Sequence, residues 1–474
     1  MLGRRMFYID GQWVDPLTPN DRPVINPVSE EAVAVVSMGM PADIDRAVAA
    51  AKRAFETYAY TTPDERLALL ERLLAIYARR YDEMVQIITL ELGAPVTMCR
   101  EQQADAGIGH VQAFIDAMKV MPWRETTPNG DTVLREPIGV CGLITPWNWP
   151  INQVVLKVIP ALATGCTCVL KPSEFTPLSA MLYAEMIDEA GFPPGVFNLV
   201  NGDGVNVGAA LSRHPDVDMM SFTGSTRAGI AVTHDAAGTV KRVTLELGGK
   251  SPNIIFADAD LEQAVTEGVL ACFGNTGQTC DAPTRMLVER SVYERALDIA
   301  GAAGRAQAVG DPALEGSHLG PLVSDIQYGR VQALIEAGIA EGARVLVGGA
   351  GRPEGFDKGY YVRPTIFADV DRTMRVAREE IFGPVLVMIP FDTETEAIGL
   401  ANDTPYGLAA YLSTGDPERA ERVAARLRAG NVHINGGPLG YGTPFGGMKQ
   451  SGNGREGGIF GLEDYVEVKA LLYP

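Results

Sequence analysis

Short apolar runs alternate with stretches of helical periodicity between residues 139 and 248, and this alternation limits the fold more than any other feature. Helical stretches such as 178–190 and 206–212 separate the runs, which lie at residues 140–144, 166–170, 196–200, 219–222 and 243–247. Strands that alternate with helices form a parallel sheet with right-handed crossovers. Ligands bind beyond the carboxyl ends of such strands. The sequence therefore predicts an α/β fold with a Rossmann-like sheet.

Helices are expected before this alternation begins. Apolar residues in the segment 44–55 recur on one helical face. Residues 62–65, Thr-Pro-Asp-Glu, combine a capping hydroxyl, a proline for the first turn and a glutamate three residues after the cap. We expect one helix to run from this cap to about Gly93, a suitable helix end.

Composition restricts the partners and the compartment. The 474 residues are enough for two or three domains, and the net charge of −19 does not fit a nucleic-acid partner. The chain has no apolar run of membrane-spanning length and no visible secretory signal, so we expect no membrane partner and a cytoplasmic location. The six cysteines form no CxxC pair and the five histidines are scattered, so we expect no metal site.

Four predicted strand ends combine glycine or proline with polar side chains: TPWNWP, KPSE, TGSTRAG and GGKSP. One such turn is ordinary, whereas four together indicate a single site. A helix that begins near Ser225 or Thr226 would offer free N–H groups to a phosphate, although an ordinary capped helix has the same pattern. Lys171 and Glu174 could hold ribose hydroxyls or form a surface ion pair.

Glu246 lies inside the apolar run 243–247. Burial raises the pKa of a carboxyl group, and a raised pKa suits a general base. The alternative is a strand whose second face, which would carry Glu246, is exposed to solvent. The glycines that follow favour a close approach of two backbones instead.

Cys280, in the stretch GQTCDAPTR, differs from the other cysteines because its neighbours are typical of a loop. Free cysteines are most often inert core residues, and this interpretation fits Cys166 and Cys168. A reactive cysteine needs a stabilised thiolate, so we expect Asp281 to point away from the sulfur.

Three glycines at 452, 454 and 457 match the G-x-G-x-x-G pattern of dinucleotide-binding proteins. They follow a loop rather than a strand, and too little chain remains beyond them for a βαβ unit. We expect a mobile or tightly turned loop here.

Seven motifs together resemble the aldehyde dehydrogenase superfamily, in particular its bacterial NAD-dependent members of broad specificity. They are PWNWP, KPSE, FTGST, LELGGKSP, GQTC, EEIFGPV and PFGGMKQSGNGRE, in the order of the family. The resemblance implies a cofactor domain at 1–117 and 138–248 and a catalytic domain at 249–450. It also implies a β oligomerisation element at 118–137 and 451–474, and a homodimer or homotetramer.

The resemblance further implies oxidation of a small-molecule aldehyde to the carboxylic acid, with hydride transfer to NAD. Cys280 would attack the aldehyde and form a thiohemiacetal and then a thioester. Asn148 and the backbone N–H of Cys280 would hold the oxyanion, and Glu246 would activate water as the general base. Use of NADP stays open.

The resemblance also assigns the cofactor site. Lys171 and Glu174 would hold the adenosine ribose, and Ser225 would contact the pyrophosphate. Glu380 would hold the nicotinamide ribose, with Phe382 beside the nicotinamide. The complete expected set is Ile144, Thr145, Pro146, Trp147, Lys171, Ser173, Glu174, Gly204, Phe222, Thr223, Gly224, Ser225, Leu247, Gly248, Glu380 and Phe382.

The sequence does not reveal which aldehyde is oxidised; Met98, Gln102, Trp149 and Tyr441 are candidates for the entrance of its pocket. A non-catalytic member of the family would be expected to lack the nucleophile, the base or the amide, and all three are present. A coenzyme A-acylating enzyme would not need Glu246. Esterase activity of Cys280 stays open as a side reaction.

Overall fold

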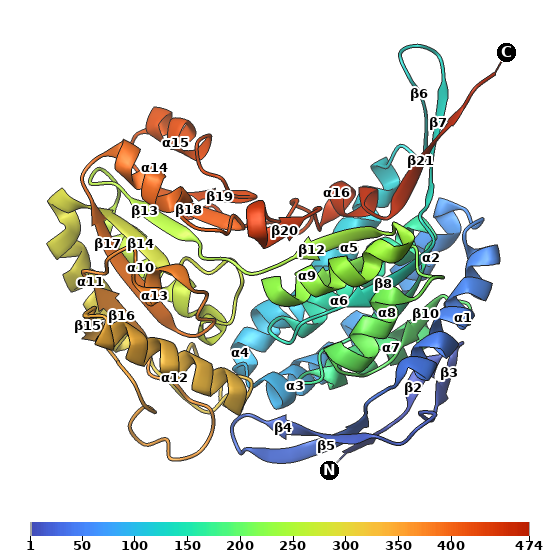
Figure 1. Cartoon of the computed structure of the whole chain (residues 1–474), viewed down its shortest axis with the longest axis horizontal. Coiled ribbons are helices and arrows are strands. Elements are labelled where there is room, and N and C mark those ends of the chain that lie inside the picture. Colours follow the sequence, from blue (N-terminus) through green and yellow to red (C-terminus); the bar gives the residue numbers. More distant parts are fainter. Residues whose placement is uncertain (1, 474) are drawn as a thin grey trace.

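An eight-stranded sheet organises one half of the molecule (Figure 1). This computed structural model describes residues 2–473, so residues 1 and 474 of the expected domains lie outside the described part. The strand order is β20-β12-β11-β8-β9-β10-β2-β3. Five central strands are parallel: β8 (Val140–Ile144), β9 (Thr167–Lys171), β10 (Phe197–Leu199), β11 (Met219–Thr223) and β12 (Arg242–Glu246). All five predicted runs are therefore strands, and the α/β class is confirmed.

Antiparallel strands close both edges of this sheet. They are β2 (Phe7–Ile9), β3 (Gln12–Val14) and β20 (Gly452–Asn453). The sequence predicts that the glycine-rich segment that contains β20 is either mobile or tightly turned. It is tightly turned, because φ is positive at Gly452, Gly454 and Gly457. Its pairing with β12 places residues that follow the strands of the other sheet along the chain against this first sheet.

Helices cover both faces of the sheet, since alternate residues of a strand point to opposite sides. Cys141 and Leu143 pack with one core, whereas Val140 and Ile144 pack with another. The first core is built chiefly from α2 (Pro63–Arg79), α3 (Tyr81–Leu92), α5 (Asp105–Val120), α6 (Pro150–Thr164) and α7 (Pro177–Glu189). The second core uses α1 (Pro41–Tyr58), α8 (Ala209–Arg213) and α9 (Thr226–Ala236). Short elements complete this half: α4 (Val96–Met98), η1 (Cys99–Gln103), η2 (Gly204–Gly208) and η3 (Ala237–Thr239).

The predicted cap at Thr62 is confirmed, because its hydroxyl accepts a hydrogen bond from the Glu65 N–H at 3.2 Å. The Glu65 carboxylate accepts in turn from the Thr62 N–H at 2.7 Å. The prediction of one helix up to Gly93 is wrong: the helix breaks at Arg80, where φ is −99° and ψ is 18°. Two acidic groups, Glu83 and Glu185, hold the Arg80 side chain at the break, and the local pattern contains no glycine or proline to signal it. Gly93 does end the second helix, in the left-handed region at φ 80°.

A seven-stranded sheet organises the other half, in the order β15-β16-β17-β14-β13-β18-β19. Its strands are β13 (Pro252–Ile255), β14 (Arg285–Glu289), β15 (Arg344–Val347), β16 (Thr365–Ala368), β17 (Val385–Phe391), β18 (Ala409–Ser413) and β19 (Asn431–Ile434). Two cores lie on its faces. The surrounding helices are α10 (Leu261–Phe273), η4 (Gly274–Gly277), η5 (Arg290–Val292), α11 (Tyr293–Ala306), α12 (Asp325–Ala340), α13 (Arg375–Arg378), α14 (Glu394–Asn402) and α15 (Pro417–Ala424). η6 (Lys449–Ser451) and α16 (Gly458–Glu463) lie in the following segment.

Two three-stranded sheets complete the fold. One consists of β1 (Leu2–Arg4), β5 (Glu31–Ser37) and β4 (Asp21–Asn26). The other stands out from the body near the C-terminus and consists of β21 (Val466–Leu471), β7 (Thr132–Pro137) and β6 (Arg124–Thr126) (Figure 1). β6 and β7 form a hairpin that turns at residues 128–131, Pro-Asn-Gly-Asp, and the C-terminal strand β21 pairs with it.

The cap gives a first prediction. Thr62→Ala removes the acceptor for the Glu65 N–H, so we expect the free energy of unfolding to fall by about 1 kcal/mol. Urea unfolding followed by circular dichroism measures this change. Thr57→Ala, at an exposed position outside any N-cap, is the control and should change the value by less than about 0.5 kcal/mol. Equal effects of the two substitutions would contradict the role of the cap.

Candidate active site

A cavity of about 160 Å³ lies where the two halves of the chain meet. The first sheet contributes residues at or just beyond the ends of β8, β11 and β12, including Pro146, Thr223 and Glu246. The second half contributes Cys280, Gln327 and Glu380. Residues more than 200 positions apart thus line one site at the carboxyl ends of the parallel strands, where the sequence places it.

A second cavity, of about 370 Å³, lies beside the first. Its lining comes from α5, α6 and the loop 439–445, and it also includes Cys280. Cys280 therefore lies at the junction of two cavities. A reactant held in either of them can reach the same residue.

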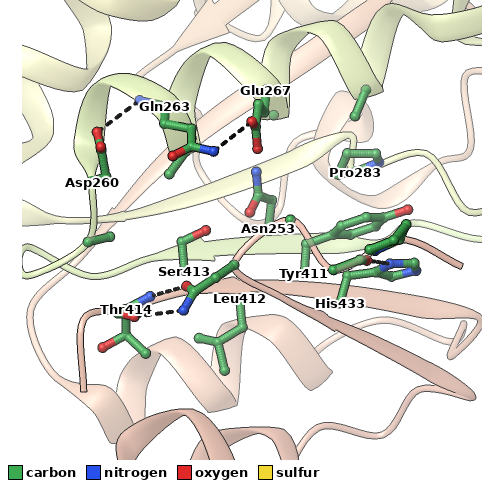
Figure 2. A pocket seen from close by; sticks show the side chains of 18 of the residues that line it. Asn253, Asp260, Gln263, Glu267, Pro283, Tyr411, Leu412, Ser413, Thr414 and His433 are labelled. Carbon is green, nitrogen blue, oxygen red and sulfur yellow. Dashed lines mark hydrogen bonds between the residues drawn. The ribbon is translucent and has the colours of Figure 1, made fainter. Parts of the chain in front are cut away.

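A third cavity, of about 420 Å³, does not reach Cys280. It is a groove beside β18 and α10, lined by Asn253, Gln263, Glu267, Tyr411 and His433 among others (Figure 2). The rings of Tyr411 and His433 stack in it with their centroids 4.5 Å apart. None of the residues predicted for catalysis or cofactor binding lines this groove.

The loop of Cys280 is fixed by close backbone contacts. A Cβ added to Gly277, where φ is 71°, would lie 2.1 Å from the Gly383 carbonyl oxygen. The Gln278 side chain donates to the Asn275 carbonyl at 3.1 Å and accepts from the Val323 N–H at 3.0 Å. The nucleophile candidate is thus held by backbone geometry that only glycine permits at position 277.

Gly249 brings the end of β12 against the same loop. A Cβ at Gly249 would lie 2.3 Å from the carbonyl oxygen of Cys280, and one at Gly248 would lie 2.4 Å from Oε2 of Glu380. The interpretation that the glycines after Glu246 permit close backbone approach is confirmed. The contact sets the distance between the strand that carries Glu246 and the loop that carries Cys280.

All six cysteines are free, and Cys280 alone among them is not fully buried. Burial raises the pKa of its thiol well above the ordinary value, and the charges of Asp281, Glu246 and Glu380 raise it further. The expectation that Asp281 points away does not hold, because Asp281 lines the same cavity as Cys280. The resting residue is therefore a thiol, and its thiolate forms more readily as the pH rises.

Asn148 is buried beside this loop with 4% of its surface exposed. One N–H of its side-chain amide donates to the Gln278 carbonyl at 3.0 Å. Gln103 and Asn275 donate to the backbone carbonyl of Asn148 at 3.0 and 2.8 Å, which fixes the position of the residue. The second amide N–H remains for a ligand oxygen in the cavity that Asn148 and Cys280 share.

Glu246 ends β12 and is 5% exposed. Neither carboxylate oxygen has a hydrogen-bond partner among the described residues. Burial raises the pKa of Glu246 well above its ordinary value, and the neighbouring charge of Glu456 adds to the shift. A buried carboxyl group without a partner is costly to the fold, and such a group next to a nucleophile is a candidate general base.

Sequence reasoning missed a buried ion pair next to this carboxyl group. Lys157 Nζ contacts Glu456 Oε1 at 2.5 Å and Ser221 Oγ at 3.2 Å. Charge on Lys157 partly offsets the rise in the pKa of Glu246. The available signal was a lysine in the middle of the apolar helix α6, where no charged residue is expected without a partner.

The predicted cofactor residues form two groups. The first lines the 160 Å³ cavity and comprises Pro146, Trp147, Thr223, Gly224, Ser225, Leu247, Gly248, Glu380 and Phe382. The second lies beside it around the end of β9 and comprises Ile144, Thr145, Lys171, Ser173, Glu174 and Gly204. Phe222, the other expected residue, packs its ring against Gly224.

Lys171 connects the members of the second group. Its ammonium group donates to the Gly202 carbonyl at 2.8 Å and lies 3.5 Å from the Glu174 carboxylate. Burial lowers the pKa of Lys171, while Glu174 opposes the shift. The Thr145 N–H donates to the backbone carbonyl of Lys171 at 3.2 Å, which ties the ends of β8 and β9 together.

The first group fits an anionic nucleotide. Ser225 caps α9 by accepting from the Ala228 N–H at 3.3 Å, and the remaining free N–H groups of the first turn favour a phosphate. The hydroxyls of Thr145 and Thr223 are buried without partners among the described residues. These groups are donors and acceptors that a bound cofactor could satisfy.

A strained turn forms the opposite wall. Phe382 has φ 60°, an uncommon value for a bulky residue, and its ring meets Trp147 edge-on with centroids 5.4 Å apart. Gln327 donates to the Phe382 carbonyl at 2.8 Å. Glu380 accepts from the Gly249 N–H at 2.9 Å, and burial raises its carboxyl pKa. The strain lies where the cofactor ring is expected, as is common for functional sites.

Three of the four entrance candidates, Gln102, Trp149 and Tyr441, line the 370 Å³ cavity, and Met98 does not. Tyr441 donates to Asp105 at 2.8 Å, and its ring lies edge-on to His110 at 4.9 Å. Burial lowers the pKa of His110 to about 4, so this imidazole is neutral at pH 7.

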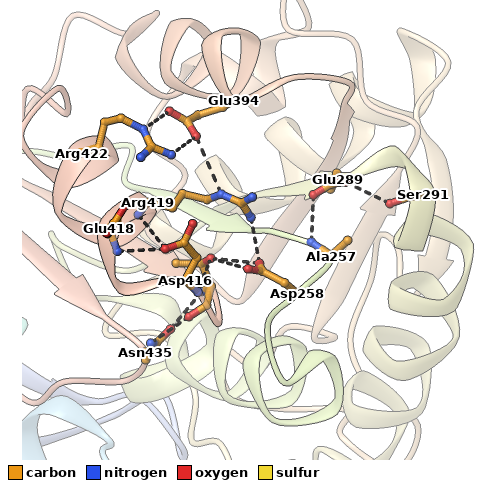
Figure 3. A network of polar contacts seen from close by, with 11 residues as sticks. Ala257, Asp258, Glu289, Ser291, Glu394, Asp416, Glu418, Arg419, Arg422 and Asn435 are labelled. Atoms are coloured by element: carbon orange, nitrogen blue, oxygen red, sulfur yellow. Dashed lines mark hydrogen bonds and ion pairs between the residues drawn. The ribbon is translucent and has the colours of Figure 1, made fainter.

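A polar network anchors the start of the loop that carries Tyr441 (Figure 3). Asn435 accepts from the Thr414 N–H and donates to its carbonyl, both at 3.0 Å. The Thr414 hydroxyl donates to Asp258 at 2.9 Å, and Arg419 contacts the same carboxylate at 2.9 Å. The second sheet thereby helps to fix the loop that lines the 370 Å³ cavity.

Comparisons with known proteins agree on one family. The profile of the Aldehyde dehydrogenase family matches residues 13–471. The chain is 53% identical to a 3-succinoylsemialdehyde-pyridine dehydrogenase of a Pseudomonas species, over 99% of this chain and 98% of the relative.

Solved structures give the same result. An aldehyde dehydrogenase from Bartonella henselae superposes with a TM-score of 0.99 at 53% identity and covers 100% of both chains. A cysteine-to-alanine mutant of aldehyde dehydrogenase C from Pseudomonas syringae, in complex with NAD+ and octanal, has a TM-score of 0.97 at 51% identity. It covers 98% of this chain and 96% of that one. The chain belongs to the aldehyde dehydrogenase family, and its class of activity is the oxidation of aldehydes.

Alkylation tests the environment of Cys280. Iodoacetamide should modify one thiol per native chain, since the other five cysteines are fully buried. Because the thiolate reacts and the thiol pKa is raised, the rate should increase about tenfold per pH unit from pH 7 to 9. Mass spectrometry of the modified chain measures site and rate, with Cys280→Ser as the control. A rate that levels off below pH 8 would contradict the raised pKa.

Proposed function

We propose that this chain oxidises an aldehyde to the carboxylic acid with NAD, with Cys280 as the nucleophile. The observation that carries the proposal is the position of Cys280 at the junction of two cavities. Groups that fit a nucleotide line the 160 Å³ cavity, whereas apolar and aromatic side chains such as Leu156, Trp149 and Phe445 line the 370 Å³ cavity together with polar and acidic ones. The relatives named above act on, or were crystallised with, an aldehyde or NAD+, which supports the same division of the site.

The proposed residues act in sequence. Cys280 loses its proton and attacks the aldehyde carbon, which gives a tetrahedral thiohemiacetal. The free amide N–H of Asn148 and the backbone N–H of Cys280 stabilise the oxyanion; in other acyl-transfer sites, loss of one such donor costs about 3–4 kcal/mol. NAD+, when bound beside Trp147 and Glu380, supplies the acceptor for the hydride that leaves this carbon.

Glu246 acts after the thioester has formed. Its carboxylate takes a proton from water, the water oxygen attacks the thioester carbon, and the acid leaves as the Cys280 sulfur is released. The raised pKa of Glu246 makes its carboxylate a stronger base once it is ionised. The rate of thioester hydrolysis should therefore increase with pH. Lys157 and Glu456 lie next to it and influence its charge.

Several further assignments form part of the proposal. Lys171 and Glu174 hold the adenosine ribose, and the carboxylate of Glu174 favours NAD over NADP because it repels a 2′-phosphate. The cofactor part comprises 1–117 and 138–248, and the catalytic part comprises 249–450. The six free cysteines favour a reducing compartment, the cytoplasm. No helix in residues 2–473 has the length and apolar character needed to cross a membrane.

Glu246→Gln tests the mechanism. The substitution should lower steady-state turnover about 100-fold or more but leave a burst of NADH of up to one equivalent, because hydride loss precedes deacylation. Stopped-flow absorbance measures both phases. Glu262→Gln, at an exposed site on α10, is the matched control and should leave turnover unchanged. Cys280→Ala should abolish both phases; retained turnover in either active-site variant would refute its assigned role.

The protruding sheet supports a homo-oligomer, as a dimer or tetramer. Its strand β21 pairs on one side with β7, and its residues 467–470 are exposed. The edge strand β19 and the groove of Figure 2 lie at the free end of the second sheet. We propose that β21 of one subunit docks against this edge of another, so that unpaired strand edges cover each other.

Light scattering tests the oligomer. Val468 is 65% exposed on β21, and a lysine there would place a charge in the proposed contact. We expect Val468→Lys to shift the mass measured at micromolar concentration toward the monomer. Val240→Lys is the control, because Val240 is 92% exposed in a turn after α9. A monomeric natural chain, or an unchanged mass for Val468→Lys, would contradict this arrangement.

A further inference from the structure

We infer that the aldehyde-side cavity, which is the cavity of about 370 Å³ lined by Asp281, selects against aldehydes that carry a second, anionic group, and that Asp281 is the residue that rejects them. The inference rests on the proposed function, since it assumes that the aldehyde binds to Cys280 from this cavity. It concerns the class of substrate: aldehydes whose chain is uncharged near the reacting carbon.

The charges that line the cavity are all of one sign. Its carboxylates belong to Glu101, Asp281 and Glu456, and its described lining contains no lysine or arginine. Its one histidine in that lining, His110, has a pKa of about 4 and is neutral at pH 7. A carboxylate on the substrate would therefore meet no cationic partner among these residues.

The three carboxylates differ in how strongly they would repel an anionic substrate. Glu456 is paired with Lys157, so its charge is largely balanced. Glu101 is exposed and lies in solvent that screens it. Asp281 is only partly exposed and accepts no hydrogen bond from any side chain in the described part of the molecule. Asp281 is therefore the carboxylate of this wall with neither a paired cation nor full solvation.

The histidine whose charge acts on Asp281 is His433, and its Nδ1 lies 2.8 Å from the Gly437 carbonyl. Tyr411 and Cys280 complete the surroundings that interact with this carboxylate. His433 and Tyr411 belong to the groove of Figure 2 rather than to the aldehyde-side cavity. No described residue on the substrate side offsets the charge of Asp281.

Asp281 lines the same cavity as Cys280 and its charge acts on the Cys280 thiol, so a short substrate bonded to that sulfur lies close to the carboxylate. Asp281 directly follows Cys280, and consecutive Cα atoms are about 3.8 Å apart. A four-carbon aldehyde bonded to the Cys280 sulfur has its far end only a few bonds from the reacting carbon. Two like charges a few ångströms apart in a partly desolvated site repel strongly. Apolar and aromatic walls at Leu156, Trp149 and Phe445 instead suit an uncharged chain.

The test compares two aldehydes of equal length and shape. With 4-oxobutanoate and its uncharged analogue 4-oxobutanamide, NADH formation by the full chain gives kcat/KM for each. We expect the anion to be about tenfold or more poorer than the amide, since about 1.4 kcal/mol of repulsion corresponds to a factor of ten. The ratio of the two values cancels any common effect on the nucleophile.

Variants identify the residue responsible. Asp281→Asn should bring the ratio of the two kcat/KM values within about threefold of unity. Asp281→Ser should have the same effect, and it serves as a second variant because it lacks the charge and also the bulk of the amide. Glu101→Gln, which removes an exposed carboxylate of the same cavity, should change the ratio less than twofold. A ratio near one in the natural chain, or one that Asp281→Asn and Asp281→Ser leave unchanged, would overturn the inference. Absence of NADH with both aldehydes would instead count against the proposed function.

Discussion

The site depends on one backbone contact, the approach of Gly249 to the carbonyl of Cys280. The segment 247–251 leaves the last parallel strand of the first sheet and enters β13 of the second, so it joins the two halves of the molecule. Any side chain at Gly249 would collide with the Cys280 backbone, and one at Gly248 would collide with Glu380. This one crossing thereby brings together the general base candidate, the nucleophile and the carboxylate assigned to the nicotinamide ribose.

Desolvation is the second organising constraint. Cys280, Glu246 and Glu380 are acidic groups packed around a small cavity, and burial is the largest cause of the raised pKa of each. Because each negative charge disfavours the others, the site favours protonated forms. A site of this kind becomes reactive when a proton is removed, and the charges of Lys157 and Arg455 ease the loss of the proton from Glu246.

The two cavities differ in the elements that line them. The 160 Å³ cavity is lined by strand ends, the start of a capped helix and a strained turn, together with the side chains of Trp147 and Glu380. The 370 Å³ cavity, the proposed aldehyde side, is lined mainly by side chains of α5, α6 and the loop 439–445. Side chains on such surfaces can change without altering the sheets, which explains how one fold accommodates different aldehydes.

The sequence by itself determined the parallel sheet, the strand ends and the chemistry placed on them. Strand periodicity, the turn motifs and the order of seven family motifs are local properties, so Cys280, Glu246 and Asn148 could be chosen from them. The break of the long helix at Arg80 was not predictable, because the contact with Glu185 that accompanies it is more than 100 residues away.

Only the tertiary structure decided which charged groups lie close to one another. The Lys157–Glu456 pair joins residues 299 positions apart, and the exposure of Asp281 to the aldehyde-side cavity depends on loops from both halves. The physical reason is that hydrogen bonding and periodicity act over a few residues, whereas burial and Coulomb interactions depend on distance in space. Local pattern therefore indicated the candidate reacting groups, and packing set the burial and the neighbouring charges that shift their pKa values.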